Sequence, residues 1–315
     1  MTVEHAFARA VDKPWGSTDL QPWSKLSHDG AAVGELWFQR ADERASSPAL
    51  LVKLLFTKEP LSIQVHPDDA FARSVGLDHG KTEAWYILSA SSGAQVATGL
   101  KTQITIPKLR ASIEDGSIAD LVQWRGVEKD DTIFVPAGTI HSIGPGIILA
   151  EIQQRSDVTY RLFDYDRHRE LQVDDAVAVA DAGPADSQPA PKRLADGRTL
   201  LVANSHFVLE RVEFLPHSIW ELTTQGETWF LVLDGNARIG PSLDVSIGDA
   251  LFVENDHAGI KTGAEGLKGL LAYVGPHINS DLLHNRDGRI DAFQSYGLTH
   301  SSPHPQKPAN LAEVQ

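Results

Sequence analysis

The sequence predicts an all-β-dominated protein with two β domains and a few short helices. Two observations lead to this prediction. Short segments rich in β-branched and aromatic residues recur along most of the chain, separated by Gly, Pro, Asp or Asn, as an antiparallel sandwich or barrel requires. In addition, 315 residues are many for one domain, so two domains are expected.

The predicted strands form two groups along the chain. The first group is Val33–Gln39, Leu50–Phe56, Ala84–Leu88, Thr132–Val135 and Ile147–Gln153. The second group, after residue 200, is Phe207–Phe214, Trp229–Leu233, Ala250–Val253 and Leu270–Val274. Each is short enough to be one strand of a compact sheet.

Three segments are predicted to be helical. Asp68–Val75 follows a His-Pro pair, and Glu170–Ala180 has apolar residues at helical spacing. Pro107–Trp124 has the same periodicity, although Gly116 weakens this interpretation because glycine disfavours helix interiors.

The clearest domain boundary is the segment from residue 181 to 197, which is rich in Pro and Ala and shows no strand or helix pattern. We therefore predict a first domain over residues 1–180, this linker, and a second domain over residues 198–315. The tail from Gly297 has three prolines and few bulky apolar residues, which predicts a poorly ordered end.

Composition narrows the possible functions. The formal charge of −14 argues against a broad nucleic-acid or anionic-membrane surface, because phosphates would be repelled. The chain has no cysteine, which excludes disulfides, Cys-ligated metals and thiol nucleophiles. No signal-peptide core or membrane-length apolar run is present, so we expect a cytoplasmic protein that binds neither nucleic acid nor membrane.

Polar side chains are placed to converge in the first domain. In Leu61-Ser62-Ile63-Gln64-Val65-His66, strand alternation puts Ser62, Gln64 and His66 on one face. By the same alternation, Lys81 and Glu83 share a face of the next segment. A Pro-Ala-Gly turn then delivers His141 to the start of another strand.

Two histidines, a glutamate and a glutamine would make a nitrogen/oxygen site for a divalent metal. Such a donor set suits Zn²⁺ with positions open for water or substrate. A single His or Glu in a strand is more often a surface or core residue, so the prediction depends on the combination.

These motifs resemble those of a known family. Pro136-Ala137-Gly138-x-x-His141 resembles the second cupin motif. Leu61 to Asp68 and Lys81-Thr82-Glu83-Ala84-Trp85 resemble the metal-binding motifs of class I mannose-6-phosphate isomerases. The resemblance implies two cupin (jelly-roll) β-barrel domains and one zinc ion per chain in the first of them. The ligands that it implies are Gln64, His66, Glu83 and His141.

Two further stretches extend the resemblance over about 165 residues. Lys13-Pro14-Trp15-Gly16 is similar to the family's N-terminal Trp-Gly element, and Glu151 to Arg161 resembles the stretch that carries its catalytic arginine. Only about 57 residues separate Glu83 from His141, so the chain is similar to the short bacterial branch, without room for a large helical insertion.

The second half of the chain also reads as a cupin, with a departure. Gln225 to Gly235 has a strand and turn in the expected order, but Glu254-Asn255-Asp256-His257 breaks the Pro-x-Gly-x-x-His pattern. No His-rich motif accompanies Glu227. We therefore expect this domain to be metal-free and structural, or else to line the pocket or bind a partner.

The implied reaction interconverts mannose 6-phosphate and fructose 6-phosphate by proton transfer through an enediol intermediate. Arg161 is the candidate for stabilising the enediolate, since its guanidinium stays charged, although a salt bridge to Asp157 or Asp164 is its structural alternative. The base is left open between Glu151, Lys81 (if its pKa is depressed) and a zinc-bound hydroxide.

The substrate's phosphate needs its own partners. Ser62 and Lys53 are the candidates, and Asp157 is counted among the substrate-binding residues. Trp15 either walls the sugar pocket or is a core tryptophan.

Two other functions compete with the isomerase. An iron-dependent cupin dioxygenase is disfavoured by Gln64, where iron cupins have a histidine. A non-catalytic sugar-binding cupin is disfavoured because it would not need Lys81, Glu151 and Arg161 beside the metal. For all three functions the expected partner is a small molecule, and for the isomerase it is a sugar phosphate. The oligomeric state is left open.

Overall fold

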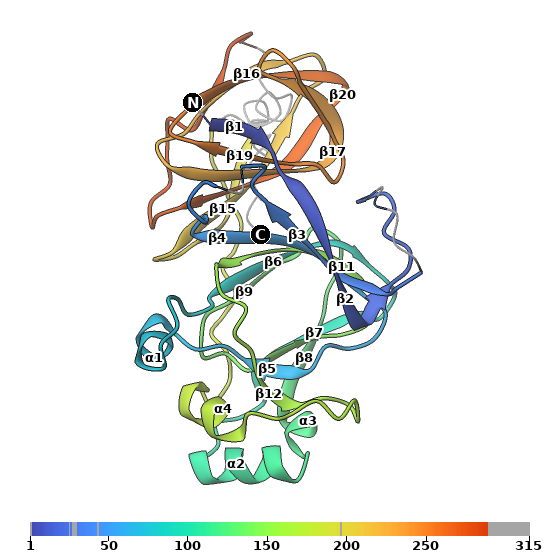
Figure 1. Cartoon of the computed structure of the whole chain (residues 1–315), viewed down its shortest axis with the longest axis vertical. Coiled ribbons are helices and arrows are strands. Elements are labelled where there is room, and N and C mark those ends of the chain that lie inside the picture. Colours follow the sequence, from blue (N-terminus) through green and yellow to red (C-terminus); the bar gives the residue numbers. More distant parts are fainter. Residues whose placement is uncertain (1, 25, 27–29, 43, 196, 289–315) are drawn as a thin grey trace, which may run out of the picture.

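A computed structural model of the chain describes residues 2–24, 26, 30–42, 44–195 and 197–288. Strands dominate it, arranged in three antiparallel sheets. Figure 1 shows an elongated molecule with one sheet system and the N-terminus at one end, and helices at the other. The predicted tail from Gly297 lies outside the described residues.

The first half of the chain forms two of the sheets. The six-stranded sheet has the order β2 (Phe7–Ser17), β3 (Val33–Gln39), β4 (Leu50–Thr57), β11 (Ile147–Gln154), β6 (Glu83–Ala90) and β9 (Thr132–Val135). The five-stranded sheet has the order β12 (Tyr160–Phe163), β5 (Ile63–Val65), β10 (His141–Ile143), β7 (Gln95–Leu100) and β8 (Val122–Gly126).

The second half forms a ten-stranded sheet. Its main path is β1 (Thr2–His5), β19 (Ala250–Glu254), β17 (Glu227–Ile239), β20 (His257–Val274), β15 (Phe207–Phe214), β14 (Arg198–Ala203) and β13 (Lys192–Arg193). Three strands branch from this path: β16 (Ile219–Thr223), β18 (Leu243–Ser246) and β21 (Leu283–Asn285).

Side-chain alternation makes the six-stranded sheet the central layer. On β4, Leu50, Val52, Leu54 and Phe56 pack into an apolar cluster shared with the ten-stranded sheet. The intervening side chains of β4 point to the opposite face, where Leu55 joins a second cluster between the six- and five-stranded sheets. Because both faces are covered, every residue of β4 is buried.

Three helices, α2 (Ile106–Glu114), α3 (Ile118–Leu121) and α4 (Val173–Val179), cover the far side of the five-stranded sheet. The fourth helix, α1 (Asp69–Ser74), lies to the side of the sheets (Figure 1). Ile63 and Val65 of β5 pack against the apolar residues of α2, α3 and α4, which leaves the other face of β5 directed at the six-stranded sheet (Figure 1). Among the described residues, no helix combines the length and apolar character needed to cross a bilayer.

Most predicted elements are present, but several were wrong in extent. The predicted strands Trp229–Leu233 and Leu270–Val274 are parts of the longer strands β17 and β20. The predicted helix over Pro107–Trp124 is two short helices, α2 and α3, followed by strand β8. Gly116 lies between the helices with a φ of 79°, a left-handed conformation that glycine adopts without strain and that ends α2.

Two chain segments connect the halves in ways that the sequence did not indicate. Strand β1 pairs with β19 of the ten-stranded sheet, although β2, which follows it directly, belongs to the six-stranded sheet. The segment 181–197, predicted to have no regular structure, contains the two-residue strand β13, which pairs with β14. Its beginning is attached to the first half, where Leu100 N donates to Gly183 O at 2.8 Å.

Candidate active site

Three strands bring the predicted metal ligands to one place between the six- and five-stranded sheets. Gln64 lies on β5 and His66 directly after it, Glu83 begins β6, and His141 begins β10. In the five-stranded sheet, Gln64 pairs with His141 on one side and with Arg161 of β12 on the other. Paired residues of antiparallel strands share a face, so these three side chains form a row directed at β6.

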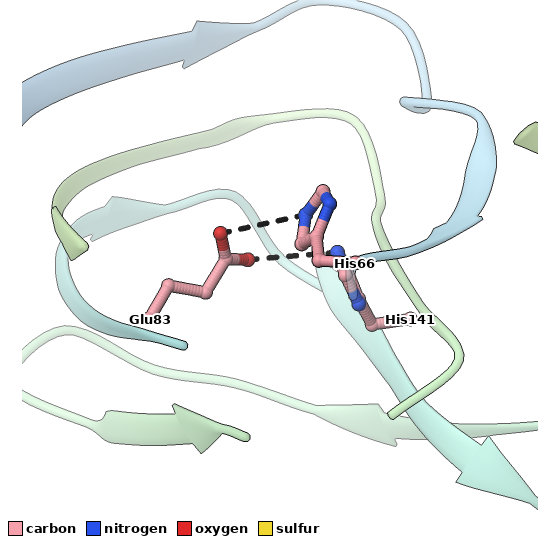
Figure 2. Close-up of side chains that lie close together, drawn as sticks. All are labelled: His66, Glu83 and His141. Carbon is pink, nitrogen blue, oxygen red and sulfur yellow. Dashed lines mark ion pairs between the residues drawn. The ribbon is translucent and has the colours of Figure 1, made fainter. Parts of the chain in front are cut away.

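The two histidines and the glutamate form a compact group (Figure 2). His66 Nε2 lies 3.5 Å from Glu83 Oε2, and His141 Nε2 lies 3.5 Å from Glu83 Oε1. One potential ligand atom from each residue lies within 4.8 Å of the others. All three side chains are buried, with exposed fractions of at most 1%.

Backbone carbonyls orient both imidazole rings. His66 Nδ1 lies 2.8 Å from Val158 O, and His141 Nδ1 lies 2.8 Å from Thr139 O. A carbonyl can only accept, so each Nδ1 carries the proton and each Nε2 presents a lone pair. The turn that delivers His141 depends on Gly138, whose φ of 90° favours glycine.

The group fits a divalent metal. His66 Nε2 and Glu83 Oε2 are buried and have no hydrogen-bond partner, which is costly for polar atoms unless a ligand completes them. Two imidazole nitrogens and a carboxylate are a common donor set for Zn²⁺ and related ions. These residues would hold such an ion from one side and leave positions open.

Gln64 lies beside this group. Its Nε2 is 3.3 Å from His141 Nε2, and its Oε1 accepts a hydrogen bond from Ser62 Oγ at 3.0 Å. Rotating the amide by 180° would present Oε1 to the ligand atoms and Nε2 to the Ser62 hydroxyl, which can equally accept. Gln64 can therefore serve as a fourth ligand without moving its backbone.

Burial sets the protonation of the group. It lowers the pKa of His141 to about 4 and that of His66 well below its usual range, with Lys81 adding to the effect at both. Burial also raises the pKa of Glu83 to about 7, against the opposing effect of Lys81. The neutral imidazoles are ready to bind a cation, whereas Glu83 must lose its proton to do so.

Glu151 and Lys53 lie on the six-stranded sheet, two residues along the strands from the position of Glu83. Lys53 pairs with Glu151, and Glu151 with Trp85. Lys53 Nζ is 3.2 Å from Glu151 Oε1, and Trp85 Nε1 donates to Glu151 Oε2 at 3.2 Å and to Glu83 Oε1 at 3.1 Å. The Trp85 indole thus joins the candidate base to a candidate metal ligand.

Lys81 is bound to the metal group itself. Its Nζ lies 3.3 Å from Glu83 Oε2. Burial alone would lower the pKa of Lys81, but Glu83 and Glu151 raise it above the usual range. Lys81 could act as a base only if its pKa were depressed. Its surroundings raise the pKa instead, so Lys81 stays protonated.

Sequence reasoning missed a buried carboxylate, Glu35 on β3. It accepts from Trp37 Nε1 at 2.5 Å, and its oxygens lie 3.1 Å from Lys13 Nζ and 3.8 Å from Lys53 Nζ. A signal was present, since β3 and β4 each carry a single charged residue in an otherwise uncharged segment. Burial would raise the pKa of Glu35, but Lys53 and Lys13 lower it.

Arg161 is not engaged in the salt bridge that would make it merely structural. Asp164 instead pairs with Arg167 and Arg169 at 3.1 and 2.5 Å, and Asp157 lies 3.7 Å from Lys53. Within the described part of the chain, Arg161 has no carboxylate within 4 Å, and its buried Nε lacks a hydrogen-bond partner. Its guanidinium is available for a ligand.

The remaining predicted residues lie around this centre. Ser62 is buried against Gln64. Asp157 is mostly exposed, at the edge of the Lys53 network. Trp15 is buried in the apolar cluster between the two sheets with Leu55 and Trp85, the environment of a core tryptophan.

Fold and site together define an antiparallel β protein with a candidate divalent-metal centre. No protein-family model matches the chain. Curated relatives do match: it is 33% identical over 242 residues to the mannose-6-phosphate isomerase of Streptococcus mutans, covering 72% of this chain and 76% of that protein. It is 40% identical over 217 residues to mannose-6-phosphate isomerase ManA of Bacillus subtilis, covering 57% and 69%.

Solved structures share the fold. The mannose 6-phosphate isomerase of Bacillus subtilis superposes with a TM-score of 0.76 at 23% identity, covering 87% of this chain and all of that one. A mutant of phosphomannose isomerase from Salmonella typhimurium gives a TM-score of 0.69 at 13% identity, with the same coverage. The chain belongs to the mannose-6-phosphate isomerase family.

Proposed function

We propose that this protein is a metal-dependent aldose–ketose isomerase that interconverts mannose 6-phosphate and fructose 6-phosphate. The observation that carries the proposal is the convergence, between the six- and five-stranded sheets, of three groups: an incomplete metal-ligand group, a buried carboxylate, and an arginine that pairs with no carboxylate of the described residues. A site that only bound metal or sugar would not need Glu151 and Arg161 beside it. The relatives' names supply mannose 6-phosphate as the substrate, and fructose 6-phosphate is the ketose that shares its enediol.

The reaction moves a proton between C1 and C2 of the open-chain sugar and exchanges carbonyl and hydroxyl. Glu151 is the base that we assign to this transfer, because Lys81 is held as an ammonium ion by its carboxylate neighbours. Lys53 Nζ and Trp85 Nε1 each bind one oxygen of Glu151. They fix its orientation, as a base serving two adjacent carbons requires.

Arg161 stabilises the negative charge that develops on the enediolate oxygens. Its guanidinium remains charged at any relevant pH and needs no reorganisation to meet this charge, since no carboxylate in the described residues pairs with it. Lys81 adds a second fixed positive charge. When bound, a divalent metal supplies Lewis-acid polarisation of the carbonyl and a hold on the sugar hydroxyls.

The finer assignments belong to the same proposal. The metal is zinc, one per chain, held by Gln64, His66, Glu83 and His141. The six- and five-stranded sheets form one cupin jelly roll and the ten-stranded sheet a second, metal-free one. Ser62 contacts the substrate's phosphate, whereas Lys53, placed among three carboxylates, serves Glu151 instead. A cytoplasmic location stays a prediction from composition.

A coupled isomerase assay tests the proposal. Purified protein is assayed with mannose 6-phosphate as isolated, after chelation and after addition of zinc. We expect activity that disappears with the metal and returns with zinc. Absence of turnover in zinc-loaded protein would contradict the proposal, and oxygen consumption in the same sample would indicate a dioxygenase.

A further inference from the structure

Gln153 on β11 has a buried amide oxygen without a partner. The side chain is fully buried, and its Nε2 donates to two backbone carbonyls, Gln154 O at 3.1 Å and Ser156 O. Since carbonyls only accept, these bonds fix which end of the amide is nitrogen. Oε1 is therefore held in a defined direction, and it has no hydrogen-bond partner.

The strand register places Gln153 beside the candidate metal centre. In the six-stranded sheet it is paired with Glu83 of β6, so the two side chains lie next to each other on one face. Glu151, two residues earlier on β11, shares that face. Gln153 thus belongs to the same inward-facing polar surface as a metal ligand and the candidate base.

A buried acceptor without a donor is costly and rare in native proteins. Both ends of the neighbouring Gln154 amide, in contrast, have hydrogen-bond partners. Its Oε1 accepts from Thr82 N at 3.0 Å, and its Nε2 donates to Asp69 Oδ1 at 2.9 Å. The missing partner of Gln153 must be a hydrogen-bond donor that enters this surface. A sugar phosphate brings several hydroxyl donors to it.

We propose that Gln153 is a specificity-determining residue whose Oε1 accepts a hydrogen bond from a hydroxyl of the sugar, at C3 or C4. This rests on the proposed isomerase function. C1 and C2 carry the reacting oxygens, C5 carries the oxygen that closes the ring of the cyclic sugar, and C6 carries the phosphate. This leaves the C3 and C4 hydroxyls to be recognised away from the reaction. A site built to bond a substrate hydroxyl discriminates against analogues that lack it.

The test compares the wild type with Gln153→Met, which keeps the side-chain volume and lacks the acceptor. Each is given mannose 6-phosphate and its 3-deoxy and 4-deoxy analogues, and product formation is followed by NMR. We expect the wild type to prefer the parent over one analogue by about 10- to 100-fold in kcat/KM. In Gln153→Met this preference should disappear, with the metal content unchanged.

A matched control is Gln154→Met, the same change one residue further on. Its amide serves the protein's own backbone and Asp69, so we expect a lower melting temperature but an undiminished preference for the parent sugar. If Gln153→Met does not fold, Gln153→Ala serves the same comparison.

The outcomes separate this inference from the function on which it rests. A variant that keeps the full wild-type preference against both analogues would overturn the role of Gln153, and would leave an ordered water as its partner. Absence of turnover of the parent sugar by the wild type would overturn the isomerase proposal, and this inference with it.

Discussion

The two halves of the molecule contain the same local pattern in different surroundings. Each has a glutamate two residues before a buried tryptophan, and the indole donates to that carboxylate, at 3.1 Å from Trp85 to Glu83 and at 2.9 Å from Trp229 to Glu227. Glu227 also accepts from Ala49 N at 2.5 Å and Leu50 N at 2.8 Å. It connects the ten-stranded sheet to β4. Glu83, in contrast, lies beside two histidines, and its Oε2 has an ion-pair contact with Lys81 at 3.3 Å but no hydrogen bond.

The arginines differ in the same way. In the second half, Arg198 Nε and Nη2 bind both oxygens of Glu210, at 2.7 and 2.8 Å, and Tyr273 OH donates to Glu210 at 2.6 Å. This buried group is complete within the protein. Arg161 in the first half has no such partner in the described residues. In both comparisons, the group without a hydrogen-bond partner lies at the candidate site, and the group with its partners in place joins parts of the scaffold.

The largest expected contrast is between Glu83→Gln and Glu227→Gln. Glu83→Gln removes the only carboxylate of the ligand group, so we expect loss of bound metal and a fall in turnover of about 10²-fold or more. Glu227→Gln places an amide donor against backbone N–H groups, which should lower the free energy of unfolding by about 1–3 kcal/mol. Metal analysis, the isomerase assay and urea unfolding measure these effects. Equal metal loss in both variants would contradict the assignment of Glu83 to the site and Glu227 to the scaffold.

The arginine pair gives the next contrast. Arg161→Ala should keep the fold and the metal but reduce turnover by about 10²-fold, the effect of losing one stabilising group in the transition state. Arg198→Met leaves Glu210 buried without its cation, so we expect about 3–5 kcal/mol less stability with unchanged turnover per folded molecule. Unchanged turnover in Arg161→Ala would return that residue to a structural role.

A smaller effect concerns protons released when the metal binds. Burial raises the pKa of Glu83 to about 7, so at about pH 6 most molecules carry a proton there that the metal must displace. The histidines are already neutral, since burial lowers the pKa of both. Calorimetry of zinc binding in buffers of different ionisation enthalpy should show more protons released per ion at pH 6 than near pH 8.5.

Glu83→Gln provides the control for this measurement. Any zinc that it binds should release no proton at either pH, because the titrating carboxyl is gone. Equal proton release by the wild type at both pH values would contradict a titration of Glu83 between them.

The sequence predicted regular strands closely because their signal is local. The bounds predicted for β3, β9 and β15 agree with the structure to the residue. Alternation also placed Gln64 and His66 on one face, and family motifs singled out the three residues of the metal group. These features depend on neighbours within a few residues of each other.

Features set by distant residues were not predictable from the sequence. The pairing of β1 with β19 joins residues about 250 positions apart. The burial of Glu35 depends on Lys13 and Lys53 from two other strands. The fit of Gln153 to the site follows from its register with Glu83, and no local pattern encodes a register between strands far apart in the chain.

The most direct test of the account is a zinc titration of metal-free protein in which bound zinc and mannose 6-phosphate isomerase activity are measured on the same samples, alongside His141→Ala. We predict activity that rises in proportion to bound zinc and reaches its plateau at one ion per chain, while His141→Ala, which lacks one of the two imidazole ligands, gains neither zinc nor activity. Full activity in His141→Ala, or in wild-type protein without bound metal, would contradict the assignment of this centre.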